Sequence, residues 1–396
     1  MFPVVEVALI VIGIALAVPV LTIGIEIIAG AKRDSAVATT VQEAPRPHVA
    51  VLVPAHNEEK AVACNLWSIS SQLMESDRLL VIADNCSDDT ANVAREQGAE
   101  VTIRSNLSER GKAYALDHGL EFLKQTGAPE IVVCVDADCQ ISPGCIDRLA
   151  RVCLDTGSPA QAADIIRSPQ PAGRFAPIVT FAWLVRDYVR PLGLHRMGFP
   201  CQLAGTGMAF LWSDICAVNL KNANLAEDLT LGLDLALNGK FARFCPDAVV
   251  TSEVAPGGTP SFAQRARWEH GSIMTGIRYA PVLVSRYWST GNVFLIAIML
   301  DLVVPPLALL SLLLAGHFAL AAILYALSGS IAPLWLAIIN NALFIMGVGV
   351  AWWCYGRETV SLRSLALAPV YVLRKVPLYL RLFVNRQTEW VRGNRS

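Results

Sequence analysis

Short apolar runs alternate with longer amphipathic stretches through the middle of the chain. The stretches at 58–73, 88–97 and 112–124 have helical character, and the runs between them are rich in β-branched residues. Strands that alternate with helices in this way predict an α/β fold, with a mostly parallel sheet covered by helices on both faces. The four predicted strands lie at 49–53, 79–83, 101–103 and 131–135.

Two other regions are almost entirely apolar. The first covers residues 4–28, whose charged residues are Glu6 and Glu26. At 1.5 Å per residue, a helix of this length crosses the ~30 Å core of a bilayer. Lys32 and Arg33 follow the run, and no basic residue precedes it. This pattern predicts a retained membrane anchor whose C-terminal end faces the cytosol, rather than a cleaved signal peptide.

The second apolar region covers residues 291–355. It contains the runs 292–315, 317–327 and 331–353, with a Ser-Gly-Ser break at 328–330. The basic tail that follows is expected in the cytosol, like the middle of the chain, so the number of intervening crossings must be even. We expect two crossings, with the short run 317–327 either extending the first helix or re-entering. Asp301 is either a functional intramembrane acid or shallow enough to reach interfacial water.

Further segments have the mixed aromatic, aliphatic and basic character of helices at a membrane surface. They lie at 174–197, 261–279 and 363–390, and prolines 369 and 377 should bend the last one. The predicted organisation is a transmembrane anchor at 1–30, a linker at 31–47, a cytosolic α/β domain at 48–260, an amphipathic interface helix at 261–288, transmembrane helices at 289–356 and a basic cytosolic tail with an interfacial helix at 357–396.

Composition supports a membrane protein and narrows its chemistry. The chain is 54% hydrophobic and 16% charged, whereas soluble domains carry roughly a quarter charged residues. Its formal net charge of -1 gives no reason to expect nucleic acid as a partner. The ten cysteines are scattered without a C-x-x-C pair, which indicates reduced cytosolic thiols rather than disulfides or a zinc site.

Polar side chains follow three of the predicted strands. The first strand leads into residues 54–58, the second into Asp84, and the fourth into Asp136 and Asp138. Ligands of an open parallel sheet bind at the carboxyl ends of the strands. The carboxylates of Asp136 and Asp138, two residues apart in extended chain, point the same way and repel each other unless a cation neutralises them. This pair favours Mg²⁺ or Mn²⁺, although Asp138 could instead cap the next helix.

Three other groups are candidates for the chemistry. Lys112 follows Arg110 and Gly111 at a helix start, where a cation and the helix end together favour phosphate. Glu227 and Asp228 open a helical stretch, where acids are also common as simple complements of the helix dipole. An amide, a guanidinium and an indole share one helix face, where they could hold a diphosphate and a sugar ring or rest on lipid headgroups. They belong to Gln264, Arg267 and Trp268.

Six short motifs, in this order and spacing, resemble the family 2 glycosyltransferases. The resemblance covers about residues 48–275, and the flanking apolar helices resemble the membrane-bound branch related to cellulose and hyaluronan synthases. The last motif is the QRxRW type, and the fourth is a DXD motif. The motifs are P-A-H-N-E-E, A-D-N-C-S-D-D-T, R-G-K-A-Y-A-L, V-D-A-D, A-E-D and Q-R-A-R-W.

The resemblance implies an A-type glycosyltransferase fold, an inverting reaction and a role for each motif. Asp228 would be the catalytic base, with Glu227 beside it, and Asp138 would ligate the metal with Asp136 on the ribose or diphosphate side. The second motif of the family often reads D-D-G-S, whereas here it reads D-N-C-S. The implied nucleotide and donor contacts are Pro54, Glu58, Asp84 (on the uracil edge), Lys112 and Arg267, and the implied acceptor contacts are Gly205, Thr206, Gln264 and Trp268.

These residues predict the transfer of a sugar from a nucleotide-diphosphate sugar, with UDP favoured by the resemblance alone. The expected acceptor is lipid-linked or a polysaccharide, at the cytosolic face of a bacterial-type inner membrane, in surface or exopolysaccharide biosynthesis. General-base help from Asp228 is typically worth about 10²–10⁴-fold. The runner-up is a processive synthase, in which a second copy or an export partner completes a channel. A nucleotidyltransferase would have a Gly-rich loop where residues 54–57 stand, and an inactive scaffold would have lost its carboxylates.

Overall fold

A computed structural model describes residues 2–31, 46–168, 173–221, 226–253 and 262–384, and at 253, 262–267 and 381–384 it describes the backbone alone. The chain divides into two compact units, which are described separately. The sheet unit consists of residues 34–169 and 199–256, and the helical unit of residues 1–33, 170–198 and 257–387.

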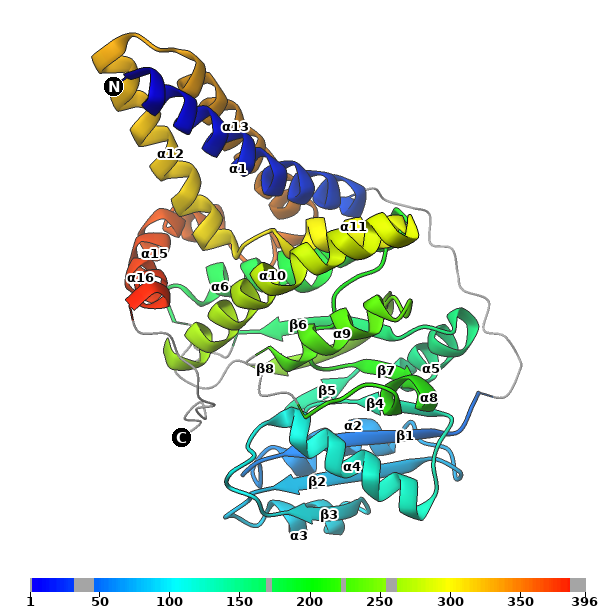
Figure 1. The fold of residues 1–396 in the computed structure, drawn as a ribbon. Helices are drawn as coiled ribbons and strands as arrows, with labels where there is room; N and C mark the ends of the chain where they lie inside the picture. Colours follow the sequence, from blue (N-terminus) through cyan, green and yellow to red (C-terminus); the bar gives the residue numbers. More distant parts are fainter. Residues whose placement is uncertain (1, 32–45, 169–172, 222–225, 254–261, 385–396) are drawn as a thin grey trace. The chain divides into compact units, whose positions relative to one another are not determined.

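The sheet unit contains an eight-stranded sheet in the order β3-β2-β1-β4-β7-β6-β8-β5 (Figure 1). The strands β3, β2, β1 and β4 run parallel, as predicted. The strand β7 runs antiparallel to β4 and β6, and β5 runs antiparallel to β8, so the sheet as a whole is mixed. The strands are β1 (Val49–Ala55), β2 (Arg78–Asp84), β3 (Glu100–Arg104), β4 (Ile131–Cys134), β5 (Cys139–Ile141), β6 (Ala160–Arg167), β7 (Met208–Leu211) and β8 (Arg243–Glu253).

Helices cover both faces of the parallel part of the sheet, because successive side chains of a strand point to opposite faces. On one face, Gly119 lies close to Leu52 and Ile82, which lets its helix approach the sheet. On the other face, Val51 and Val53 cluster with residues of three further helices. The helices of this unit are α2 (Val62–Ser70), α3 (Thr90–Glu96), α4 (Lys112–Thr126), α5 (Cys145–Thr156), α8 (Trp212–Cys216) and α9 (Glu227–Leu237).

The helical unit has three helices that are long and apolar enough to cross a membrane, within the residues that the structure describes. They are α1 (Phe2–Ala31), α12 (Leu307–Ser328) and α13 (Ala332–Ala351), which continues into η2 (Trp352–Gly356). The run 317–327 is therefore part of one longer helix. That helix begins only after Pro306, and the preceding apolar residues form the separate helix α11 (Val293–Leu302). Two candidate spans thus follow residue 290, the number that the charge pattern predicts, although the crossings themselves remain a prediction.

Buried polar contacts hold α1 against the other apolar helices. The His317 Nε2 and the Leu9 carbonyl lie 3.0 Å apart, and the Asn340 amide donates to the Gly13 carbonyl at 2.8 Å. A Cβ at Gly13 would lie 2.4 Å from the Leu336 side chain. Only a residue without a side chain permits this approach, which is typical of helix packing in membranes.

Asp301, at the end of α11, has a structural partner. Its carboxylate accepts a hydrogen bond from Arg190, whose Nε also donates to the Glu26 carboxylate at 2.6 Å. All three side chains are buried. The three charged side chains join α1, α7 (Arg190–Arg196) and α11. Neither of the two roles considered for Asp301 from the sequence included these ion pairs.

The predicted surface segments are helical. The first forms α6 (Ala176–Leu184), η1 (Val185–Val189) and α7 without a break, and the second forms α10 (Phe262–Thr290). The third is divided into α14 (Leu362–Leu365), α15 (Ala368–Arg374) and α16 (Val376–Val384). Pro369 and Pro377 are the second residues of α15 and α16, positions where the missing N–H has no helical partner to lose.

Candidate active site

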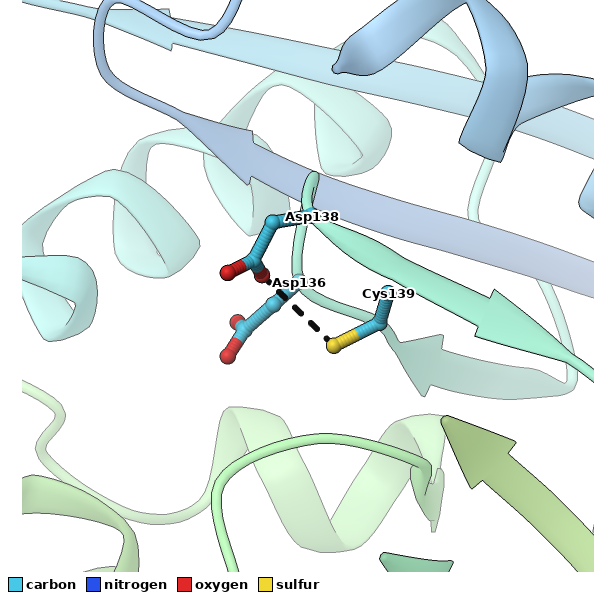
Figure 2. A group of neighbouring side chains, drawn as sticks. All are labelled: Asp136, Asp138 and Cys139. Carbon is cyan, nitrogen blue, oxygen red and sulfur yellow. Dashed lines mark hydrogen bonds between the residues drawn. The ribbon is translucent and has the colours of Figure 1, made fainter. Parts of the chain in front are cut away.

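Asp136 and Asp138 lie in the turn between β4 and β5. Figure 2 shows their carboxylates pointing to the same side of the turn. One oxygen of each carboxylate and the Cys139 sulfur all lie within 4.8 Å of one another. The Cys139 thiol donates to Asp138 Oδ1 at 3.6 Å, and burial, followed by the nearby Asp138, raises its pKa well above the ordinary value. The sulfur is therefore a hydrogen-bond donor, which leaves two carboxylates as oxygen ligands suited to Mg²⁺ or Mn²⁺.

Lys112, the first residue of α4, joins two further parts of this site. Its ammonium pairs with the Asp136 carboxylate and donates to the Gly205 carbonyl at 2.6 Å. Burial alone would lower the pKa of Lys112, but Asp136 and, more weakly, Asp228 raise it above its ordinary value. The lysine therefore stays charged at neutral pH.

The loop before β7 brings Asp228 to the same place. Gly205 has φ +94°, and a Cβ built on it would lie 3.0 Å from Asp228 Oδ2. Thr206 accepts a hydrogen bond from the Asp136 amide at 3.1 Å. Gly207 has φ +63°, and its Cβ would lie 2.5 Å from Val250, so the loop is closely packed against β8. The loop thus links the acids after β4 to the start of α9.

Asp228 and Glu227 are the first two residues of α9, and both are half-buried. The free N–H groups and the dipole of a helix N-terminus favour acidic residues in the first turn. Burial, followed among the raising causes by the carboxylates of Asp138 and Asp228, raises the pKa of Asp136 even though Lys112 opposes the shift. The site therefore holds more negative charge than one lysine neutralises, which fits a divalent cation held by Asp136 and Asp138.

Asp84 ends β2 at the same edge of the sheet, since β1, β2 and β4 are parallel. Its carboxylate is buried and accepts from Arg104 Nη1 at 2.8 Å and from the Asn85 amide at 3.0 Å. The sequence interpretation missed Arg104. The parallel register pairs Asp84 with Arg104, so an arginine that ends the third strand beside an aspartate that ends the second was the available signal.

The loops after β1 and β2 are joined to each other. The His56 Nδ1 donates to the Asp84 carbonyl at 2.7 Å, and the Glu58 amide donates to Thr90 Oγ1 at 2.8 Å. Asn85, which departs from the family pattern, has φ +54°, a conformation that asparagine tolerates better than most residues. Its side chain also accepts from the Asn106 amide at 2.8 Å. This loop pair holds the end of β1, including Pro54, beside β2.

The remaining predicted site residues belong to the helical unit. Gln264 and Arg267 lie in α10, and their side chains are outside the described part of the structure. Trp268 packs edge-to-face on Trp183 with ring centroids 5.5 Å apart. The structure thus brings together Lys112, Asp136, Asp138, Gly205, Thr206 and Asp228 through contacts, and it places Pro54, Glu58 and Asp84 at the carboxyl ends of neighbouring strands.

The parallel strands β3, β2, β1 and β4, extended by the antiparallel strand β7, form the sheet of an A-type glycosyltransferase fold. The structure of the mannosyltransferase PcManGT from Pyrobaculum calidifontis, in complex with GDP-Man and Mn²⁺, has a TM-score of 0.55 to this chain at 20% identity. The similarity covers 93% of this chain and 99% of that one. It supports the fold class predicted from the sequence.

The sequence also matches a family profile, described as glycosyltransferase-like family 2, over residues 45–271. This match spans more than half of the 396 residues, so the chain belongs to that family. It is 27% identical over 242 residues to the probable glycosyltransferase YdaM of Bacillus subtilis, and 35% identical over 98 residues to the 4,4'-diaponeurosporenoate glycosyltransferase of Staphylococcus haemolyticus. These matches cover 57% and 24% of this chain, and 55% and 25% of the length of those relatives.

Proposed function

We propose that this protein is an inverting glycosyltransferase that moves a sugar from a nucleotide-diphosphate sugar to a lipid-linked or polysaccharide acceptor. The observation that carries the proposal is the linked set in which Lys112 contacts both Asp136 and Gly205 while Gly205 lies against Asp228. In this set the Lys112 ammonium and the Asp228 carboxylate lie around one loop, which supports the roles proposed for them below. Family membership and the A-type fold support the same reaction class.

Asp228 is the general base of the proposed reaction. It takes the proton of an acceptor hydroxyl as that oxygen attacks the anomeric carbon and the bond to the diphosphate breaks. A single displacement of this kind inverts the anomeric centre. General-base catalysis is typically worth about 10²–10⁴-fold. Lys112, held charged by Asp136, offsets negative charge that develops on the departing diphosphate.

Asp138 and Asp136 are the residues that would hold Mg²⁺ or Mn²⁺. When bound, the cation would supply positive charge to the diphosphate and so stabilise the leaving group. Asp84, Glu58 and Pro54 are proposed to contact the nucleoside, with Arg104 holding the Asp84 carboxylate in place. Gly205 and Thr206 are proposed on the acceptor side, and Glu227 beside the base.

The proposed location is a bacterial-type inner membrane, with the sheet unit in the cytosol. The three candidate spans among the described residues support an integral membrane protein. They also favour single addition over processive synthesis, since a channel for a polymer requires more helices than one copy of these spans. The role in surface polysaccharide assembly is part of the same proposal.

The test is sugar transfer by purified full-length protein, with a panel of UDP- and GDP-sugars and a lipid extract as acceptor. GDP-sugars are included because the similar archaeal structure holds GDP-Man. We expect one donor to be consumed only when Mn²⁺ or Mg²⁺ is present, and EDTA to abolish transfer. Asp138→Ala should lose the metal-dependent part of donor binding. Transfer that is indifferent to EDTA would contradict the assignment of the metal site.

A further inference from the structure

The helix that carries the Gln-Arg-Ala-Arg-Trp motif is joined to the C-terminal segment immediately after the motif ends. Trp268 is followed by Glu269, whose carboxylate pairs with the Lys375 ammonium, and both side chains are largely buried. The next residue, His270, is 2% exposed, and its Nε2 donates to the Leu378 carbonyl at 3.1 Å. Two consecutive residues of α10 therefore both contact the short stretch from Lys375 to Leu378.

These two contacts restrain rotation as well as translation of α10. Adjacent residues of an α-helix point about 100° apart around its axis. Glu269 and His270 therefore hold the turn 375–378 from two directions, and α10 cannot rotate about its axis without breaking one contact. Because Trp268 directly precedes this pair, its direction is set by the same restraint.

The indole ring of Trp268 also has a contact of its own. Its indole packs edge-to-face on Trp183 at 85°, and the Arg186 guanidinium lies 4.6 Å from the centre of the Trp183 ring. This stack belongs to α6 and η1, whereas the partner of Glu269, Lys375, lies between α15 and α16. The tryptophan is therefore held by a ring contact of its own and, through the two residues that follow it, by the C-terminal segment.

The C-terminal segment is anchored in turn to a candidate membrane span. Leu378 and Tyr379 are buried in one cluster with Ala308, and Leu312 and Val372 pack against it. Ala308 and Leu312 lie in the first turns of α12. The segment 375–379 thus connects the start of α12 to the end of the motif. Direct contacts therefore link the start of this candidate span to the residues that follow Trp268.

We propose that Lys375, Glu269 and His270 are positioning residues, which hold the Gln-Arg-Ala-Arg-Trp motif in the orientation needed for sugar transfer. The inference rests on the proposed function, together with the donor and acceptor contacts that the family resemblance implies for Gln264, Arg267 and Trp268. These residues act through Trp268 and the turn before it, and they touch no reacting atom. The C-terminal segment then supports the orientation of the motif, in addition to any role in membrane attachment.

The test compares Lys375→Met with the swap Glu269→Lys/Lys375→Glu in the full-length protein, labelled with 5-fluorotryptophan. The ¹⁹F resonance of Trp268 is identified by its loss in Trp268→Phe. Lys375→Met should move or broaden that resonance and lower turnover by about tenfold or more, the scale expected when a site group is misplaced by a fraction of an ångström. Turnover is measured at saturating donor, because a displaced motif should also weaken the donor contact expected of Arg267.

The swap should restore both the resonance and the turnover, because it rebuilds the ion pair with reversed charges. Arg78→Met is the matched control, since it breaks the Arg78–Glu100 ion pair in the sheet unit and should change neither readout. His270→Leu removes the second contact and should reproduce the shift if Lys375→Met folds poorly. A Trp268 resonance that is unchanged in both Lys375→Met and His270→Leu would overturn the proposal that these residues position the motif. If the wild type transfers no sugar, the proposed function fails. The Trp268 resonance still shows whether Lys375 and His270 hold the tryptophan in place.

Discussion

Replacement of Gly205 by alanine tests whether the loop before β7 sets the position of Asp228, the proposed general base. The alanine Cβ would lie 3.0 Å from Asp228 Oδ2, whereas ordinary contacts begin at 3.4 Å, so the oxygen must withdraw by the difference, about 0.4 Å. A misplacement of ~1 Å can cost about 10²-fold in rate, so a shift of this size should cost about tenfold. Alanine at φ +94° also strains the backbone by about 1–3 kcal/mol.

Gly239→Ala is the control that separates the two effects. Gly239 has φ +82°, and a Cβ there would meet nothing within 4 Å. Both variants should therefore lose similar thermal stability, but only Gly205→Ala should lose turnover at saturating donor and acceptor. The measurements are thermal unfolding and initial rates of sugar transfer in detergent. Equal rates for the two variants, at equal loss of stability, would refute the assigned contact between the loop and Asp228.

Two further substitutions test the structure around the site and in the helical unit. Arg104→Met leaves the buried Asp84 carboxylate without its ion pair, so it should lower the free energy of unfolding by about 3–5 kcal/mol. Arg104→Met/Asp84→Asn should recover part of this loss. If urea unfolding shows Arg104→Met to be as stable as the wild type, the pair contributes little. Gly193→Ala would place a Cβ 1.9 Å from the Glu26 carbonyl, so it should sharply reduce the yield of folded protein in detergent. Gly24→Ala is the control, because a Cβ there would meet nothing within 4 Å and the yield should not fall. Equal yields of the two variants would argue against the close crossing of α1 and α7.

The parts of the fold that follow from local pattern were predictable from the sequence. The apolar runs located β1 to β4 because buried parallel strands are continuous in apolar residues. The acids at the ends of these strands indicated Asp84, Asp136 and Asp138, since parallel strands end at one edge. The strands β5 and β7, of three and four residues, are too short to show a periodicity.

The contacts that depend on chain topology were not predictable in the same way. Lys112 was expected beside a phosphate, but its hydrogen bond to the Gly205 carbonyl spans 93 residues of sequence. The pairing of Arg190 with Asp301 spans 111 residues and depends on how the apolar helices pack. No local signal reports such pairs. The break before α12 did have a signal, because Pro305 and Pro306 stand where the apolar run is interrupted.

The most direct measurement for the central claim is the comparison of Asp228→Asn with the wild type in donor binding and in sugar transfer. Asparagine keeps the size of the side chain but cannot accept the acceptor's proton. The account predicts that the Kd of the nucleotide donor in the presence of Mn²⁺ stays within about twofold, while turnover falls by about 10²-fold or more. Near-normal turnover in Asp228→Asn would contradict the account.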